Sequence, residues 1–120
     1  METLGALLNK LEEKYGNDFY WSVIEGNNFL DELNSELTED HPLHGKARKA
    51  LARSYLQDDF LFLLDDKSYA IVHLTFSKNN INGFPLFEIF DDLQSVINDI
   101  ENKHLEWMKE SDSHAAGWDS

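Results

Sequence analysis

Residues 60–76 have the sequence FLFLLDDKSYAIVHLTF, in which two runs of apolar and aromatic residues flank a polar turn at 65–68. Such runs on both sides of a four-residue turn are typical of an antiparallel hairpin. If Leu64 pairs with Tyr69, one face carries Phe60, Phe62, Leu64, Tyr69, Ile71, His73 and Thr75, and the other carries Leu61, Leu63, Ala70, Val72, Leu74 and Phe76. Neither face is polar, so we expect the hairpin to be covered on both sides or to offer one side to a partner.

Three other segments bear on the size of the sheet. Residues 84–90, FPLFEIF, predict a further strand, with Pro85 near its start where a missing N–H does no harm. Residues 19–24 and 46–56 fit either a strand or a helical segment, and their composition does not decide between the two. We therefore expect a meander of three or four strands.

Helical periodicity appears before and after these strands. Apolar residues at helical spacing predict a first helix capped by Thr3, a second helix starting near Asn28, and a last helix opened by Asp91 and Asp92. The buried stripe of the last helix comprises Leu93, Val96, Ile97, Ile100, His104 and Trp107. The sequence thus predicts an α+β fold, an antiparallel β-meander packed with N-terminal and C-terminal amphipathic helices. We expect one domain over 1–108 and a disordered tail over 109–120.

Charge and composition exclude several classes of function. The 120 residues include 23 acidic and 10 basic side chains, for a net charge of −13, and there is no cysteine. Such a protein is repelled by nucleic acids and anionic membranes, and it has no thiol for disulfides, zinc or catalysis. The first residues do not resemble a signal peptide, so we expect a cytoplasmic protein. The sequence has no recognisable cofactor-binding motif, so we expect no cofactor. A basic segment with Lys46, Arg48, Lys49 and Arg53 is expected to pair with the protein's own carboxylates or to be solvated.

Few residues form a recognisable catalytic or metal-binding motif. His41 and His44 have the spacing of two metal ligands on one helical turn, although this pattern is common by chance. The acidic pairs Asp58-Asp59, Asp65-Asp66 and Asp91-Asp92 are typical of turns and helix starts, where carboxylates accept backbone hydrogen bonds. We therefore assign no catalytic or metal site from these residues.

The residues Asp58-Asp59-Phe60-Leu61-Phe62 and Tyr69-Ala70-Ile71-Val72-His73-Leu74-Thr75-Phe76-Ser77 resemble a family of small bacterial proteins of unknown function. Glu36-Leu37 and the segment His41-Pro42-Leu43-His44-Gly45 resemble the part that precedes the hairpin in that family. The resemblance covers roughly residues 33–92 and carries no known activity. It implies an intracellular bacterial domain and a strand at 47–55. Any role shared across the family would fall on His41, Asp59, His73 and Thr75.

Together these observations favour a non-enzymatic, acidic, protein-binding domain, similar in charge to immunity proteins and antitoxins, or a homodimer. The binding surface would be the hairpin face with Phe60, Phe62, Tyr69, Ile71 and His73. The alternative is a small hydrolase or metal-dependent enzyme that uses His41, His44 or His73 with Asp59. A third hypothesis is a DNA mimic, which requires a regular row of carboxylates on one surface.

Overall fold

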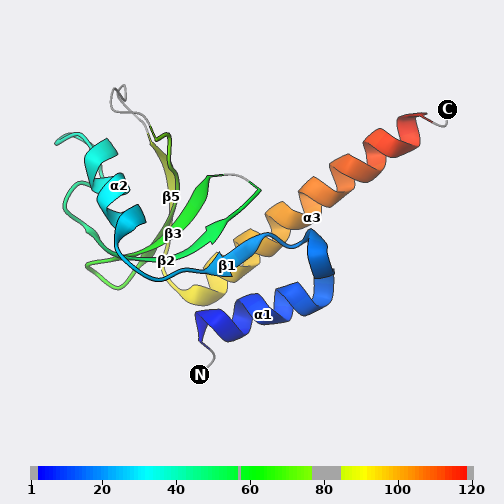
Figure 1. Cartoon of the computed structure of the whole chain (residues 1–120), viewed down its shortest axis with the longest axis horizontal. Coiled ribbons are helices and arrows are strands. Elements are labelled where there is room, and N and C mark those ends of the chain that lie inside the picture. The colour runs from blue at the N-terminus through cyan, green and yellow to red at the C-terminus, as the bar shows by residue number, and fades with distance from the viewer. Residues whose placement is uncertain (1–2, 57, 77–84, 119–120) are drawn as a thin grey trace.

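The computed structural model describes residues 3–56, 58–76 and 85–118, with side chains up to residue 109. Five strands form one antiparallel sheet in the order β1-β2-β3-β4-β5, so each strand pairs with its neighbour in the sequence (Figure 1). The strands are β1 (Trp21–Val23), β2 (Ala47–Ser54), β3 (Asp59–Leu64), β4 (Tyr69–His73) and β5 (Leu86–Phe90). The helices are α1 (Leu4–Tyr15), α2 (Asn28–Glu36) and α3 (Leu93–Trp118), with a short 3-10 turn at Gly16–Asp18. The α+β prediction is confirmed, with five strands where three or four were expected.

Both segments that the sequence left open form strands. Trp21, Ser22 and Val23 pair with the end of β2, and β2 pairs along its other edge with β3. The register of β2 is irregular between Ala50 and Ala52, so these two alanines face opposite sides of the sheet although they are two residues apart. Small residues here let helices approach both faces of β2.

The predicted register of the hairpin is wrong by one residue. Tyr69 pairs with Leu63, because the turn closes earlier: Leu64 donates its N–H to the carbonyl of Ser68 at 2.9 Å. The loop between them has three residues, and Lys67 adopts a left-handed conformation with φ of 70°. This is the usual geometry of a three-residue hairpin loop with a bulge. The shift moves every side chain of β4 to the face opposite the one expected.

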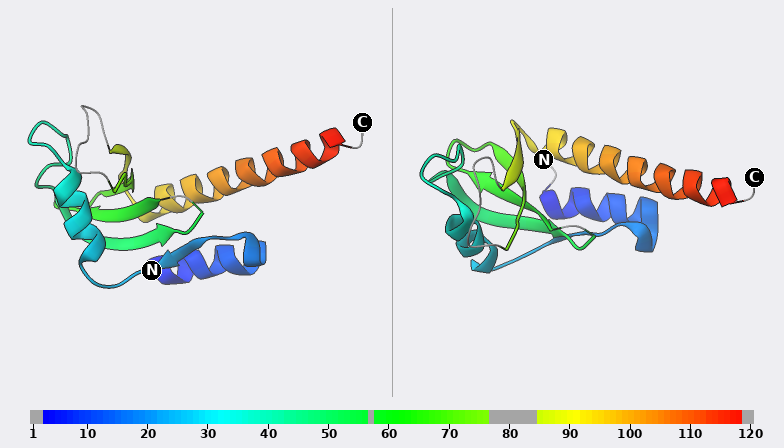
Figure 2. Two further views of the ribbon diagram at one scale, coloured as in Figure 1. Left: turned by 45° about the horizontal axis from the view of Figure 1, so that its top comes forward. Right: turned by 90° about the horizontal axis from the view of Figure 1, so that it is seen from above.

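One face of the sheet is covered by α2. Phe60 and Phe62 of β3 are fully buried there, together with Val72 of β4 and Leu33 of α2. The rings of Phe29 and Phe60 lie 4.4 Å apart, which fixes α2 over the centre of the sheet. Figure 2 shows α2 on this side and the two other helices on the opposite side.

The opposite face is covered by α1 and α3. Leu61 and Ile71 point into this layer, where Leu8 of α1 and Ile100 of α3 are also buried. The two helices are joined by Glu101, which accepts hydrogen bonds from Lys14 at 2.8 Å and from Tyr15 at 2.6 Å. Among the described residues, the chain's own helices therefore cover most of both apolar faces of the hairpin.

Helix α3 is longer than the sequence indicated. Its backbone continues to Trp118 and projects beyond the sheet (Figures 1 and 2). Residues 109–116 contain no glycine or proline that would stop a helix. The domain boundary at 108 and the disorder of 109–120 in solution stay predictions. Among the residues that the structure describes, no helix is long and apolar enough to cross a membrane.

Candidate functional site

A groove lies between α3 and the sheet, on the face that α1 and α3 cover. It consists of a hollow of about 250 Å³ and a smaller one of about 110 Å³, and Asp59, Ile71 and Lys103 line both. Tyr20, Trp21 and Trp107 line the larger hollow, so that aromatic rings from two segments form its walls. The ring planes of Tyr20 and Trp107 are almost perpendicular, and their ring centres lie 5.9 Å apart.

Carboxylates outnumber cations along this groove. Asp59, Asp99 and Glu106 line the larger hollow, and Glu88 lines the smaller one. Lys103 is the lysine that both hollows share, and its Nζ lies 2.8 Å from Glu88 Oε1 and 3.0 Å from Asp99 Oδ2. Burial alone would lower the pKa of Lys103, but the bonds to Glu88 and Asp99 outweigh it and raise that pKa. Lys103 is therefore a fixed cation inside an acidic groove.

Asp59 and His73 form a side-chain hydrogen bond at the groove. Asp59 Oδ1 lies 3.0 Å from His73 Nδ1, across the β3–β4 ladder in which the two residues are partners. The side chain of His73 is 50% exposed. Of the four polar residues singled out in the sequence, these are the two that the structure brings together.

His41 has a structural role. Its Nδ1 accepts the N–H of Leu43 at 3.1 Å, so its Nε2 carries the proton and donates to the carbonyl of Pro85 at 3.0 Å. Its ring also packs against Phe87, 5.1 Å away, on the face of the sheet opposite the groove. His41 is buried and His44 is exposed, so the two do not form a pair of ligands. Within the described residues, no three His, Asp or Glu side chains come together as metal ligands.

Thr75 belongs to a polar cluster around Glu36, just after the end of β4. Glu36 is 3% exposed, and it accepts hydrogen bonds from the Thr75 N–H, the Thr75 hydroxyl and the Phe76 N–H at 2.7–2.9 Å. Burial raises the pKa of Glu36, but hydrogen bonds from Glu32, Thr75 and Phe76 outweigh it and hold that pKa below its ordinary value. Glu36 thus fixes the last turn of α2 to the end of β4.

The predicted binding face with Phe60, Phe62, Tyr69, Ile71 and His73 is not one surface. Phe60 and Phe62 lie in the layer under α2, while Tyr69 and Ile71 lie in the layer under α1 and α3. The one-residue shift of the hairpin separates them. His73, on the same face as Ile71, is the exposed member of the set.

The basic segment pairs with the protein's own acids in one described case. Arg48 lies 3.8 Å from Asp65, and both side chains are exposed. Arg53 instead places its guanidinium 4.6–5.0 Å from the ring centres of Phe29, Tyr55 and Phe60. Cation–π contact of this kind anchors Arg53 to the layer under α2.

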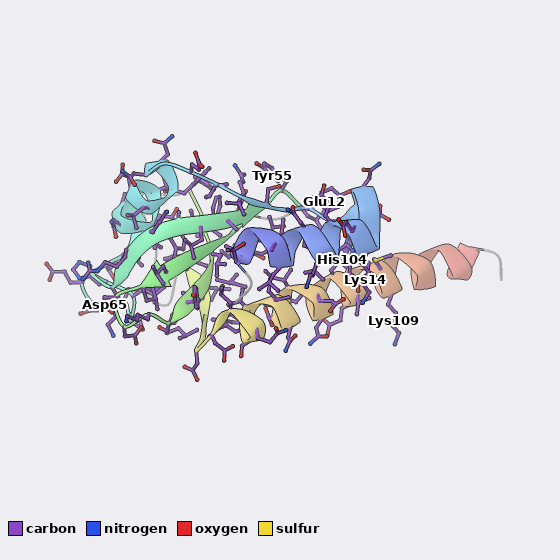
Figure 3. All side chains as sticks on the ribbon, turned by 90° about the horizontal axis from the view of Figure 1, so that it is seen from below. Glu12, Lys14, Tyr55, Asp65, His104 and Lys109 are labelled. Atoms are coloured by element: carbon purple, nitrogen blue, oxygen red, sulfur yellow. The ribbon has the colours of Figure 1, made fainter. Side chains whose placement is uncertain are left out.

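His104 forms the inner end of the groove, where α1, α3 and the 3-10 turn meet (Figure 3). Its ring packs between Tyr15 at 4.6 Å, Phe19 at 5.6 Å and Trp107 at 5.7 Å. Its Nε2 is buried and has no hydrogen-bond partner among the described residues. Burial lowers the pKa of His104, and the nearby carboxylates Asp18 and Glu101 offset this only in part.

This lowered pKa predicts a loss of stability in mild acid. Because folded His104 resists protonation, its contribution is complete above the unfolded pKa of about 6.5 and decreases as the pH falls below that value. We expect the urea midpoint to decrease between pH 7.5 and 5.5 in the native chain and to decrease less in His104→Gln. His44→Gln, at an exposed position, is the control and should keep the native slope. Equal slopes in all three proteins would contradict the assignment.

The sequence contained a signal for part of the groove that the motif search missed. Asp99, Lys103 and Glu106 follow one side of α3, next to the buried positions Ile100 and His104. Charged residues that border a buried stripe at helical spacing indicate a polar edge, and three of them here line one hollow. Comparison of the chain with protein-family models, curated proteins and solved structures finds no match.

Proposed function

We propose that this protein binds a basic segment of another protein in the groove between α3 and the sheet, without catalysing a reaction. The observation that supports this most directly is the composition of the groove: four carboxylates along the two hollows, and three aromatic residues in the larger one, around a single lysine. As part of the same proposal, and in line with the resemblance noted above, the protein would act in the bacterial cytoplasm.

The chemistry of the groove favours a cationic ligand for two reasons. Lysine and arginine side chains gain from carboxylates and from the faces of aromatic rings, and Trp107 and Trp21 supply such rings beside Asp59 and Glu106. The net charge of −13 adds a long-range field that attracts basic proteins and speeds their association. Immunity proteins and antitoxins that neutralise basic toxins use the same attraction, and here the analogy rests on charge.

An octapeptide of alternating arginine and glycine tests the proposal as a probe. We expect it to shift the amide resonances of α3, β3 and β4, and to bind more weakly as salt increases because ionic screening weakens charge attraction. Glu106→Lys reverses a charge in the groove and should weaken binding about three- to tenfold.

The matched control is Glu12→Lys, which makes the same change at an exposed residue of α1 that does not line the groove (Figure 3). It should reduce affinity less than twofold, through the long-range field alone. Equal losses in the two variants would assign binding to net charge and contradict a specific groove. Absence of any shift with the peptide would contradict the proposal altogether.

The Asp59–His73 pair favours one alternative, a small hydrolase. A carboxylate on Nδ1 orients the ring and leaves Nε2 to act as a general base, as in many hydrolases. However, no serine or threonine hydroxyl is hydrogen-bonded to His73 in the described part of the chain, and Ser54 of the larger hollow is buried. A panel of nitrophenyl esters and phosphates discriminates the two: turnover by the native chain that His73→Gln abolishes would favour the enzyme.

A further inference from the structure

Strand β5 forms one edge of the sheet, and nothing in the described part of the chain pairs with its outer side. An open edge presents unpaired N–H and C=O groups, which bind readily to another strand. Two apolar side chains of β5 are solvent-exposed, Leu86 at 56% and Ile89 at 51%. They lie on opposite faces of the sheet, since Leu86 is the partner of His73 and Ile89 is the partner of buried Ala70.

We propose that two copies of this chain associate through antiparallel pairing of their β5 strands, with the two-fold axis at Glu88. In that register Leu86 lies opposite Phe90 of the second copy, and Phe87 lies opposite Ile89. Every pair beside the axis is then apolar, and each pair projects on one face of the joined sheet. The occupant of this edge is a second copy because the sequence LFEIF is complementary to itself in this register.

Neighbouring registers are less favourable. An axis at Phe87 would place Leu86 opposite Glu88, and an axis at Ile89 would place Glu88 opposite Phe90. Each of these sets a carboxylate against an apolar side chain twice in the interface. The register centred on Glu88 avoids this arrangement and brings together only the two glutamates.

Lys103 reduces the electrostatic repulsion between the two Glu88 carboxylates. Like charges directly opposite each other destabilise a strand pair. Here each Glu88 is bound to Lys103 of its own α3 at 2.8 Å, and the Lys103 side chain is 48% exposed. Two lysines therefore lie beside the two glutamates at the axis and reduce the repulsion between them, although each lysine is shared with Asp99 of its own helix.

The absence of cysteine gives a direct test of the register. Glu88→Cys places two thiols opposite each other, within the Cα separation of about 4.5–5.5 Å that a disulfide spans. Leu86→Cys places its two thiols roughly 13 Å apart along the strands, beyond reach of a disulfide. Under mild oxidation we expect covalent dimers from Glu88→Cys and none from Leu86→Cys. Cross-linking of Leu86→Cys to the same extent would overturn the register.

Sedimentation equilibrium tests the association itself. We expect the native chain to form dimers whose population rises with salt, because two copies each of charge −13 repel and salt screens that repulsion. Ile89→Lys should shift the equilibrium toward monomer at least tenfold. Leu105→Lys, a matched change at a 45% exposed apolar position on α3, should leave it unchanged.

A monomer at all salt and protein concentrations would overturn the inference, as would equal effects of the two lysine variants. These results are separable from the proposed binding function, because salt should weaken the binding of a basic peptide and strengthen the dimer. Glu88 belongs to both the groove and the edge, but the opposite salt dependence lets one proposal fail while the other holds.

Discussion

Phe60→Ala should lower the free energy of unfolding by about 3–5 kcal/mol, the largest effect expected for a single apolar substitution in this chain. Phe60 is 0% exposed, and its ring contacts those of Phe29, Phe62 and Phe76 as well as the guanidinium of Arg53. Removing it leaves a cavity between α2 and the sheet and takes away one of the three rings on which Arg53 lies. Urea unfolding followed by circular dichroism measures the change.

Phe76→Ala is the control for this prediction. Phe76 lies 6.1 Å from Phe60 between ring centres, yet it is 50% exposed. Its truncation removes the same chemical group from a neighbouring position without opening a cavity, so we expect a cost below about 1 kcal/mol. A similar loss in both variants would mean that Phe60 does not occupy the centre of the core.

Glu36→Ala should cost about 3 kcal/mol, an effect comparable to the loss of a large core side chain. The substitution removes the carboxylate that accepts partly buried hydrogen bonds from the Thr75 N–H, the Thr75 hydroxyl and the Phe76 N–H. Because the pKa of Glu36 is lowered on folding, its contribution is present above the unfolded value and is lost as the pH falls through the folded one. The cost should therefore be larger at pH 7 than at pH 3.

Glu36→Gln and Glu39→Ala complete this comparison. Glutamine retains one carbonyl oxygen, so we expect it to recover part of the lost stability. Glu39 lies in an exposed turn just beyond α2, and its truncation should change stability by less than about 0.5 kcal/mol. A Glu36→Ala protein as stable as Glu39→Ala would show that the cluster does not fix the end of β4.

Much of the fold could be predicted from periodicity because the signals were long. The hairpin, the strand after Pro85 and the amphipathic helices at both ends all follow from apolar spacing that the structure uses directly. The predicted register of the hairpin was wrong because the observed one depends on Lys67. This residue adopts a left-handed conformation although it is not glycine. Such a conformation is more often taken by glycine or asparagine, so no residue in the turn indicated a three-residue loop.

The candidate site was harder to predict because it depends on contacts between distant segments. Asp59 and His73 were singled out by the family resemblance, but their pairing could not be predicted, because the expected register would have placed Asp59 opposite Leu74. His41 could not be assigned a role, because its partner Pro85 is 44 residues away. The partnerless nitrogen of His104 likewise results from the packing of α1 against α3, which no local pattern specifies.

The order of the strands also has a consequence for how the chain folds during synthesis. Because each strand pairs with the previous one, the sheet grows in the direction in which the ribosome delivers it, and few contacts wait for distant residues. The exception is α3, which follows the sheet in the sequence and, together with α1, covers Leu61 and Ile71. Until α3 has been synthesised, part of the apolar surface on that side of the sheet is exposed to solvent. A chaperone would bind the nascent chain during this interval.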